Sequence, residues 1–509
     1  MNPMTKVVGF FVRFDKNNEK MIEISGEEFE RRIKSDENYF NDITINFEKG
    51  INLSTPLLNE KLIFKNVTFK GMEVNFSGIQ VEEVSKSSNL AFQNCYFLSN
   101  ILFSTCSLNS LTFISCIINN KLFQIRNCNI NDLSFEENIE DISNVKPNIV
   151  KSGIIKINRG KISSIDFENI QFEDGSLRIT EQKSTMNFAI VKSTLNNIII
   201  SNCDFNDYFD YLSNKTTSKT NSSLFNRCTF NQSSFFETKF SSKTNFNNCI
   251  FNNSTDFKCI NNEIIGDLKF SDCDFHKFTD FDKSKIHKLR LEKIRFHDFV
   301  SFQETYFDIV EIDKTSFEKG AYFDDIQIKK IDDCDRKTIR TIKHQLQKAE
   351  NKIDYNRFRV YEFNSYRKDI KKKLKEFEKD KNHLNHRVRE PIQLKRDAFI
   401  LWISDIVSEY GTDWKRALKF TLYSGLILYS FFFICENYEY NIDLTNWNNI
   451  TRFISGLFRF FLVTDFFNPL DSDRTYLTNP LSWLIFIIGK IAIAFGAYEM
   501  IQSFRKFKA

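Results

Sequence analysis

Residues 225–257, FNRCTFNQSSFFETKFSSKTNFNNCIFNNSTDF, contain the repeat that decides the fold. Phenylalanine recurs here about every five residues, and two longer series run on beyond the segment with successive steps of 21, 24, 21 and 21 residues. The first series comprises Phe230, Phe251, Phe275, Phe296 and Phe317, and the second comprises Phe236, Phe257, Phe281, Phe302 and Phe323. Two residues before the first series, the first three units carry Cys228, Cys249 and Cys273.

A coil of about 20 residues with an inward apolar group every five residues predicts a β-solenoid with four faces per coil. One coil cannot bury its phenylalanines alone, so stacked coils must form ladders of like residues along the axis. We predict that both phenylalanine series and the cysteines are these interior ladders. A metal site is the alternative for the cysteines, but ligands 21 residues apart without histidine are unsuitable. Free cysteine is a small buried hydrophobe, and we expect no metal and no cofactor.

The C-x-F triplets at 228–230, 249–251 and 273–275 resemble the pentapeptide-repeat family, in which a small residue lies two before a central Leu or Phe. The resemblance implies a right-handed quadrilateral β-helix over residues 45–332. It is clear over 225–323, whereas residues 130–220 depart from the pattern. We expect residues 1–44 to cap the solenoid, because Ser25 before Gly-Glu-Glu-Phe is a helix N-cap signal.

The chain changes to helical periodicity from Asp335, and residues 333–411 are predicted to form a helical hairpin and an amphipathic linker. Tyr410-Gly411 has the composition of a helix C-cap. This segment carries an excess of basic residues, which suits the anionic face of a membrane. The predicted membrane-surface residues are Lys371, Lys372, Lys373, Lys375, Lys415 and Arg416. For the lysines of this group, a solvated helix face is an equal alternative.

Residues 412–509 are predicted to be a transmembrane domain with spans at about 417–435 and 481–501. A third apolar stretch, at about 452–470, is short and contains Arg459, so we interpret it as re-entrant or interfacial. Basic residues precede the first span and follow the second. This pattern predicts that both termini lie in the cytoplasm. The family resemblance implies that the membrane is a bacterial inner membrane. We therefore expect an all-helical membrane domain after a mainly β solenoid.

Two spans around a re-entrant segment resemble the C-terminal potassium-channel-like domain of some pentapeptide-repeat proteins. Val463-Thr464 matches the pore segment of that family, but its filter glycines are missing and Pro469 occupies the region. Potassium selectivity is therefore not supported. The polar residues that we single out as pore or intramembrane candidates are Arg459, Thr464, Asp465, Lys490 and Glu499. They form either a pore or sensing site or polar contacts between helices, and Asp465 is a candidate partner of Lys490.

The sequence contains no metalloprotease, hydrolase or phosphate-loop motif, so we expect no catalytic residues and no enzyme. Our first hypothesis is a homo-oligomer, a tetramer if channel-like, whose cytoplasmic solenoid senses a protein or ligand and controls a pore-forming or membrane-perturbing domain. Under this first hypothesis, the protein acts in stress or anti-phage defence, a role for which no residue is direct evidence. The second hypothesis is a membrane-anchored binding scaffold. A DNA-mimicking topoisomerase-binding protein ranks last, because acidic and basic residues nearly balance over residues 41–330 and no nucleic acid is expected.

Overall fold

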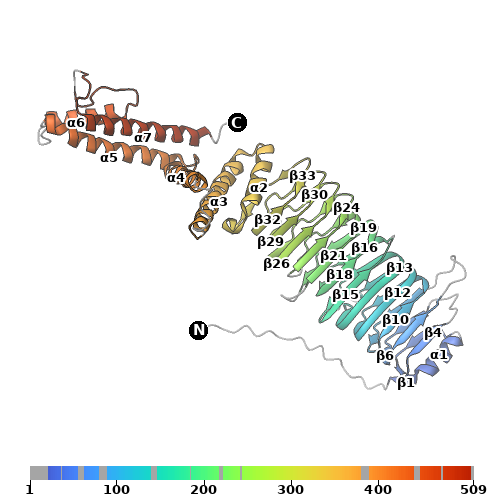
Figure 1. The fold of residues 1–509 in the computed structure, drawn as a ribbon. Helices are drawn as coiled ribbons and strands as arrows, with labels where there is room; N and C mark the ends of the chain where they lie inside the picture. The colour runs from blue at the N-terminus through green and yellow to red at the C-terminus, as the bar shows by residue number, and fades with distance from the viewer. Residues whose placement is uncertain are drawn as a thin grey trace, which may run out of the picture. The chain divides into compact units, whose positions relative to one another are not determined.

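The structure is a computed structural model, and its elements are shown in Figure 1. It describes residues 21–35, 37–54, 62–79, 89–138, 146–183, 185–216, 222–240, 243–379, 389–440, 447–471 and 474–505. The chain divides into two compact units, one of residues 1–280 with 294–297 and one of residues 281–293 with 298–509. Each unit is described by itself below.

The predicted β-solenoid is confirmed: parallel strands form about twelve turns over residues 22–328. Each strand pairs with the equivalent strand of the next turn, so consecutive turns repeat the same register. The longer strands of the first unit are β11 (Ser107–Ile114), β12 (Ile117–Glu136), β13 (Ile149–Glu168), β16 (Thr185–Val191), β19 (Asp204–Leu212), β22 (Thr229–Ser234) and β26 (Asn261–Ser271). Those of the second unit are β29 (Lys285–Glu292) and β32 (Tyr306–Asp313), and the last strand is β35 (Gln327–Ile328).

The core of each turn is a layer of stacked phenylalanine rings. In the first unit Phe230 stacks on Phe251 with ring centroids 4.9 Å apart, and Phe251 stacks on Phe275 at 4.3 Å. Phe275 stacks on Phe296 at 4.8 Å. In the second unit the rings of Phe281, Phe302 and Phe323 stack at 4.9 and 5.0 Å. Phe317 is buried as well, and its ring meets that of Phe323 edge-on.

The assignment of Phe236 to the second ladder is wrong. Phe235 is the buried residue that stacks on Phe257, with ring centroids 4.6 Å apart, and Phe236 is half-exposed. The register explains the difference. Ser233 pairs with Thr255, so the corner after Phe230 is one residue shorter than the corner after Phe251.

The corners of the turns require left-handed backbone at recurring positions. Arg227, Asn248 and Asp272 have φ of 53°, 52° and 53°, and each immediately precedes a ladder cysteine. A left-handed conformation costs a residue with a side chain about 1 kcal/mol or more. The regular stacking of buried rings in these turns offsets this cost, so these corner positions do not require glycine.

The solenoid begins before the predicted boundary at residue 45. Strand β1 (Ile22–Ser25) pairs in parallel with β3 (Ile43–Phe47). Helix α1 (Gly26–Lys34) begins at the predicted N-cap, where the Ser25 hydroxyl accepts a hydrogen bond from the backbone N–H of Glu28 at 3.2 Å. The ring of Phe29 from α1 packs against Phe40 and Phe47 of the first turns. Residues 1–20 of the predicted cap lie outside the described residues.

The turns between residues 117 and 212 keep the same parallel pairing with a largely aliphatic core. Strands β12 and β13 pair over most of their length, and Ile155, Ile157, Ile162 and Ile165 are fully buried. Isoleucine thus fills inward positions that phenylalanine fills elsewhere. This substitution is why the five-residue pattern fades in this part of the sequence while the fold continues.

The ladder cysteines lie in the core and bond to the backbone of the preceding turn. The Sγ of Cys249 donates to the carbonyl oxygen of Phe225 at 3.5 Å, and that of Cys273 donates to Phe246 at 3.4 Å. Cys228 makes the same contact with Ile200. Burial raises the pKa of the Cys249 thiol well above its usual range, so this thiol stays protonated.

Asp166 gives a pH-dependent prediction for the solenoid. Burial, then the nearby carboxylates of Glu168, Glu136 and Asp132, raise its pKa to about 6. Ionising Asp166 therefore costs more in the folded chain than in the unfolded chain. The cost is absent below about pH 4, where both forms are protonated, and is complete above about pH 6.

Asp166→Asn is accordingly expected to raise the free energy of unfolding near neutral pH by about 1 to 2 kcal/mol, because solvent screens this half-buried carboxylate and reduces the full effect of the shift, with no gain in acid. Circular-dichroism melting of detergent-solubilised protein at both pH values measures it. Asp174→Asn, at an exposed aspartate of the same solenoid, is the control and should change little. An equal gain in acid would show that ionisation is not the cause.

Helix α2 (Arg336–Lys348) covers the end of the last turns in the second unit. Its side chains supply partners for strand N–H groups: Thr338 Oγ1 accepts from Ile312 N at 2.8 Å, and Gln345 Oε1 accepts from Ala321 N at 3.3 Å. Ile339 of the same helix is buried. Because an uncovered parallel edge invites pairing with another chain, α2 closes this end of the sheet.

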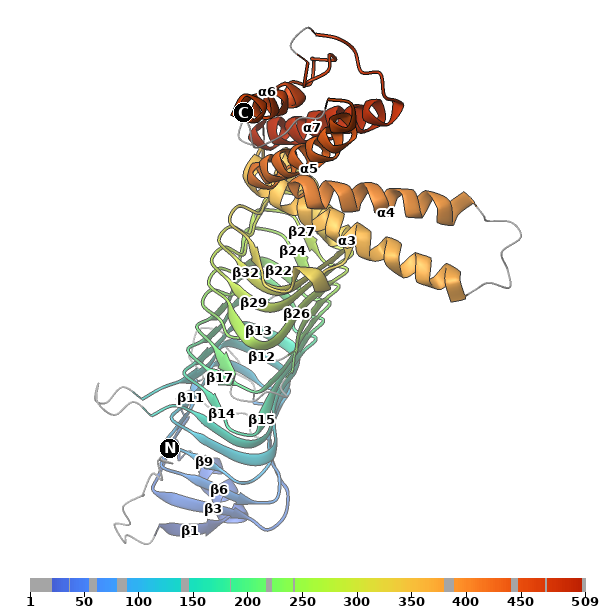
Figure 2. The ribbon, with the colours of Figure 1, turned by 90° about the vertical axis from the view of Figure 1, so that its left-hand side faces the viewer.

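The remaining helices of the second unit follow α2 along the chain. They are α3 (Lys352–Lys379), α4 (Arg389–Ser408), α5 (Trp414–Tyr440), α6 (Trp447–Phe461) and α7 (Pro480–Arg505). Figure 2 shows α3 and α4 side by side, and α5 packs along α7. The short 3-10 helix Ile331–Asp333 joins the last turn to α2.

Candidate functional site in the apolar helix region

Two helices in the described part of the chain are long and apolar enough to cross a membrane. They are Trp414–Glu436 of α5 and Pro480–Arg505 of α7. Both coincide with the predicted spans. Most residues of either helix are not buried within the chain itself. Apolar side chains on these free faces suit contact with lipid or with further copies of the helices.

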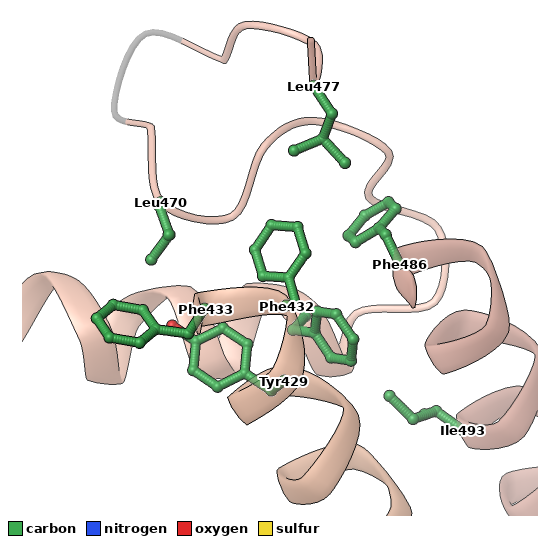
Figure 3. Packing of buried hydrophobic residues seen from close by; sticks show 8 residues of the cluster. Tyr429, Phe432, Phe433, Leu470, Leu477, Phe486 and Ile493 are labelled. Atoms are coloured by element: carbon green, nitrogen blue, oxygen red, sulfur yellow. The ribbon is translucent and has the colours of Figure 1, made fainter. Parts of the chain in front are cut away.

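A cluster of aromatic and aliphatic side chains joins α5, α6 and α7 (Figure 3). Tyr429, Phe432 and Phe433 come from α5, Phe486 and Ile493 from α7, Phe460 from α6, and Leu470 and Leu477 from the segment after α6. The Tyr429 hydroxyl donates to the carbonyl oxygen of Phe453 at 2.6 Å. Gly489 lets α6 come close, since a Cβ there would lie 2.8 Å from Cε1 of the buried Phe460 ring.

Lys490 of α7 caps the C-terminal end of α6. Its Nζ donates to the carbonyl oxygens of Arg459, Phe460 and Leu462 at 3.2, 3.0 and 2.6 Å. The ammonium group also lies 4.7 Å from the centroid of the Phe486 ring. The last carbonyls of a helix have no partner within the helix and carry partial negative charge. The buried lysine therefore binds two carbonyls of the last turn of α6 together with that of Leu462, just after the helix.

Arg459 ties the segment after α6 back to the helix. Its Nη1 donates to the carbonyl oxygen of Asp471 at 2.6 Å, and its Nε lies 3.4 Å from Oδ2 of Asp465. Asp465 therefore pairs with Arg459. The predicted pairing of Asp465 with Lys490 is not a direct contact: the ammonium group of Lys490 donates to backbone carbonyls, and Asp465 acts on it only through its nearby charge.

The five candidate residues thus separate into two places. Arg459, Asp465 and Lys490 meet at the end of α6. Thr464 lies in the same segment, but its side chain is exposed. Glu499 lies further along α7, where it contacts the helical linker.

Glu499 joins α7 to the end of α4. The hydroxyl of Ser408 donates to Oε2 of Glu499 at 2.6 Å and accepts from the backbone N–H of Gly411 at 2.7 Å. All three groups are buried. α4 ends at Ser408, and Tyr410 and Gly411 have φ of 59° and 77°, as the predicted C-cap requires. This tight turn places the Ser408 hydroxyl next to the Glu499 carboxylate.

The same turn is held from the other side by α3. Arg359 Nη2 donates to the carbonyl oxygen of Tyr410 at 2.9 Å, and the Tyr410 hydroxyl donates to Oδ1 of Asn364 at 3.1 Å. Arg367 Nη1 pairs with Oδ2 of Asp405 at 2.6 Å. We call Ser408, Tyr410, Gly411 and Glu499, with these α3 partners, the joint.

α3 is fixed in turn to α2. Glu362 receives hydrogen bonds from Arg340 at 2.9 Å and Lys343 at 2.5 Å. Burial alone would raise the pKa of Glu362, but the two hydrogen-bonded cations outweigh it and hold the pKa below its usual value. Arg357 Nη2 also donates to the carbonyl oxygen of Ile326 in the last turn. Polar contacts therefore lead without interruption from the last turn, through α2 and α3, to α7.

The basic residues predicted at the membrane surface are all exposed in the structure. Lys371, Lys372, Lys373 and Lys375 lie on α3, and Lys415 and Arg416 lie at the start of α5. Arg416 also lies 3.3 Å from Asp413. Their contact with a membrane stays a prediction.

Two functional candidates were missed by sequence reasoning. Glu436 of α5 is buried, and Asn468 Nδ2 donates to its Oε2 at 3.3 Å. Oε1 of Glu436 has no hydrogen-bond partner in the described part of the chain. Ser408, two residues before the predicted C-cap at Tyr410-Gly411, carries no sequence signal of its own. An acidic residue at the end of an apolar run was the available signal for Glu436.

No family model, curated protein or solved structure matches this chain. Fold and site together define a β-solenoid followed by helices, two of which are candidate membrane spans.

Ser408→Ala is expected to lower the free energy of unfolding by about 2 kcal/mol, since it leaves the buried Glu499 carboxylate and the Gly411 N–H unpaired. A double-mutant cycle with Glu499→Ala in detergent-solubilised protein should give a coupling energy of about 1 to 3 kcal/mol. Ser424→Ala, which removes a part-buried hydroxyl of α5, is the control. A coupling near zero would mean that the contact does not hold α4 to α7.

Proposed function

We propose that this chain is an oligomeric membrane protein in which a cytoplasmic solenoid controls a pore-forming or membrane-perturbing helical domain. α5 and α7 cross the membrane, and both termini lie in the cytoplasm. The solenoid binds a protein or ligand, and α2, α3 and α4 transmit that event. The resemblance to pentapeptide-repeat proteins with a channel-like domain supports the same division of roles.

The observation that carries this proposal is the series of polar contacts from the last turn to α7. Arg357 holds the last turn, Glu362 joins α3 to α2, and the Ser408–Glu499 contact reaches α7. A helix pair that only anchors a domain needs no ionisable group inside its packing. Burying a charged group among apolar helices costs free energy, and such groups usually mark a functional site. Glu499 and Lys490 are two such groups on one helix.

The pore segment is proposed to act without a carbonyl-lined potassium filter. The carbonyls of Arg459, Phe460 and Leu462 are occupied by Lys490, and the segment after them is held by Arg459. Two spans cannot enclose a pore, so several copies must assemble, and four is the number that the channel resemblance implies. The exposed apolar faces of α5 and α7 are available for that assembly.

Ion or dye flux through liposomes that contain the purified chain tests the proposal. We expect flux that depends on protein density and that falls at least severalfold in Ser408→Ala, whose solenoid is unchanged. Ser424→Ala, in the same helix region but outside the joint, should keep the wild-type flux. Liposomes that never leak at any protein density, with cell extract as a source of ligand, would refute the proposal.

The alternative is a membrane-anchored binding scaffold. It predicts that a chain lacking residues 412–509 keeps the full cellular effect of the protein. The effector proposal predicts that this deletion abolishes the effect while partner binding by the solenoid survives.

A further inference from the structure

The inference concerns helix α4, which carries large apolar residues on the side turned away from its neighbour α3. The side that faces α3 makes polar contacts: Asp405 pairs with Arg367, and Oδ2 of Asp397 accepts from the Tyr366 hydroxyl at 3.4 Å. A surface helix of a globular domain turns its apolar side to its neighbours. α2 does so, with Ile342 and Leu346 buried.

The opposite side of α4 carries a stripe of large apolar residues that stand free. Ile392, Phe399, Trp402 and Ile406 are 61%, 57%, 46% and 50% exposed. Their spacings of three, four and seven residues put them on one side of the helix. Phe399 and Trp402 stack with ring centroids 6.0 Å apart. We call these four residues the α4 stripe.

Two exposed cations interrupt this side of the helix. Lys395 follows Ile392 by three residues and lies within the α4 stripe, whereas Arg396 follows by four residues and lies at its margin. On the neighbouring α3, Lys371, Lys372, Lys373 and Lys375 are exposed too. Apolar rings with flanking basic residues are typical of a helix that lies in a membrane interface, where long basic side chains reach the headgroups.

A second copy of this chain is a poorer occupant of the stripe. Pairing two stripes face to face would bring Lys395 and Arg396 of both copies together, whereas Asp397 and Asp405 of α4 already bond to α3. An anionic lipid surface instead complements both parts of the face. α4 also ends only six residues before α5, a proposed span, so its C-terminal end must lie near the membrane boundary if α5 crosses.

We propose that α4 is an interfacial helix whose stripe is immersed in an anionic lipid leaflet. The inference rests on the proposed function, because it requires that α5 and α7 cross the membrane. It adds a lipid-binding surface between the solenoid end and the spans, on the helix that carries Ser408 and Asp405 of the joint contacts.

Trp402 is the probe for this surface. The full chain is reconstituted into vesicles of phosphatidylcholine, with or without phosphatidylglycerol, in which some acyl chains are brominated near the headgroup. The emission of Trp402 is obtained by subtracting the emission spectrum of Trp402→Phe from that of the wild type. We expect blue-shifted emission that shallow bromines quench, and about half of that quenching should be lost in Phe399→Ser/Ile406→Ser. Gln393→Ser, an exposed position outside the stripe, should leave quenching unchanged.

Charge is tested by Lys395→Gln/Arg396→Gln, which should remove any gain in quenching from phosphatidylglycerol, since basic groups are attracted to an anionic surface. Emission typical of water without quenching in either lipid would overturn the inference. Trp402 emission could instead be blue-shifted without quenching by bromines, with a shift that grows with protein density. That result would overturn the inference in favour of contact between Trp402 and a second copy of the chain. Extraction of the same vesicles with alkaline carbonate separates this inference from the proposed function. Release of the chain from the vesicles would refute the membrane spans. Retention of the chain with unquenched Trp402 would refute only the role of α4.

Discussion

Lys490→Met is expected to lower the free energy of unfolding of the helical domain by about 2 to 4 kcal/mol. The substitution keeps most of the side-chain volume but removes the ammonium group that binds the carbonyls of Arg459, Phe460 and Leu462. The carbonyls of Arg459 and Leu462 would each keep a backbone N–H donor, so the loss falls mainly on the buried carbonyl of Phe460, next to the aromatic cluster. We expect the end of α6 to separate from α7 and the flux proposed above to be lost.

Unfolding of detergent-solubilised protein in increasing sodium dodecyl sulfate, followed by tryptophan fluorescence, measures this loss. Lys419→Met makes the same chemical change at an exposed lysine of α5 and should alter stability by less than about 0.5 kcal/mol. If Lys490→Met proved as stable as the wild type, the lysine would not be a structural cap. The presence of its charge would then have to be explained by the pore alone.

Gly160→Ala is expected to destabilise the solenoid by about 3 kcal/mol or more. Gly160 has φ of +114°, a region that residues with a side chain rarely adopt, and it lies opposite Cys128 in the β12–β13 register. A Cβ at this position would come within 2.8 Å of the backbone nitrogen of Cys128. Backbone cannot yield as a flexible side chain does, so the two turns would have to move apart.

The thermal midpoint of the β-sheet signal in circular dichroism reports the effect. Gly78→Ala is the matched control, because Gly78 has φ of +63° and no atom within 4 Å of the added methyl group. It should cost only about 1 kcal/mol, the conformational penalty alone. Equal losses in the two variants would show that backbone conformation, rather than the contact with Cys128, governs this position.

The solenoid was predictable wherever phenylalanine marks the turns. Phe230, Phe251 and Phe275 repeat at the turn length and stack as their spacing indicates. The period fails as a guide in two cases. In the first case, a corner is one residue shorter, so Phe235 rather than Phe236 occupies the inward position. Both residues are phenylalanine, so the sequence does not reveal the shift. Turns built on isoleucine carry no distinctive signal, because isoleucine is common in many folds.

The helical site was predictable in part. Hydropathy located both candidate spans, and the rule that a charge in an apolar helix needs a partner singled out Lys490. Its partners could not be predicted, because they are backbone carbonyls and every residue has one. The contact between Ser408 and Glu499 joins residues 91 positions apart, and nothing in either local pattern refers to the other.

The stacking of Phe251 on Phe275 has a consequence for how such a chain can change. Their turn contains 24 residues and the preceding one contains 21, yet the two rings lie as close as any pair in the ladder. The extra residues of this turn therefore leave the spacing of the stacked rings from one turn to the next unaffected. Within the first unit, insertion of a short foreign peptide at a corner should alter the surface of one turn only. The fold thus offers positions where new recognition loops can arise by insertion without refolding of the neighbouring turns.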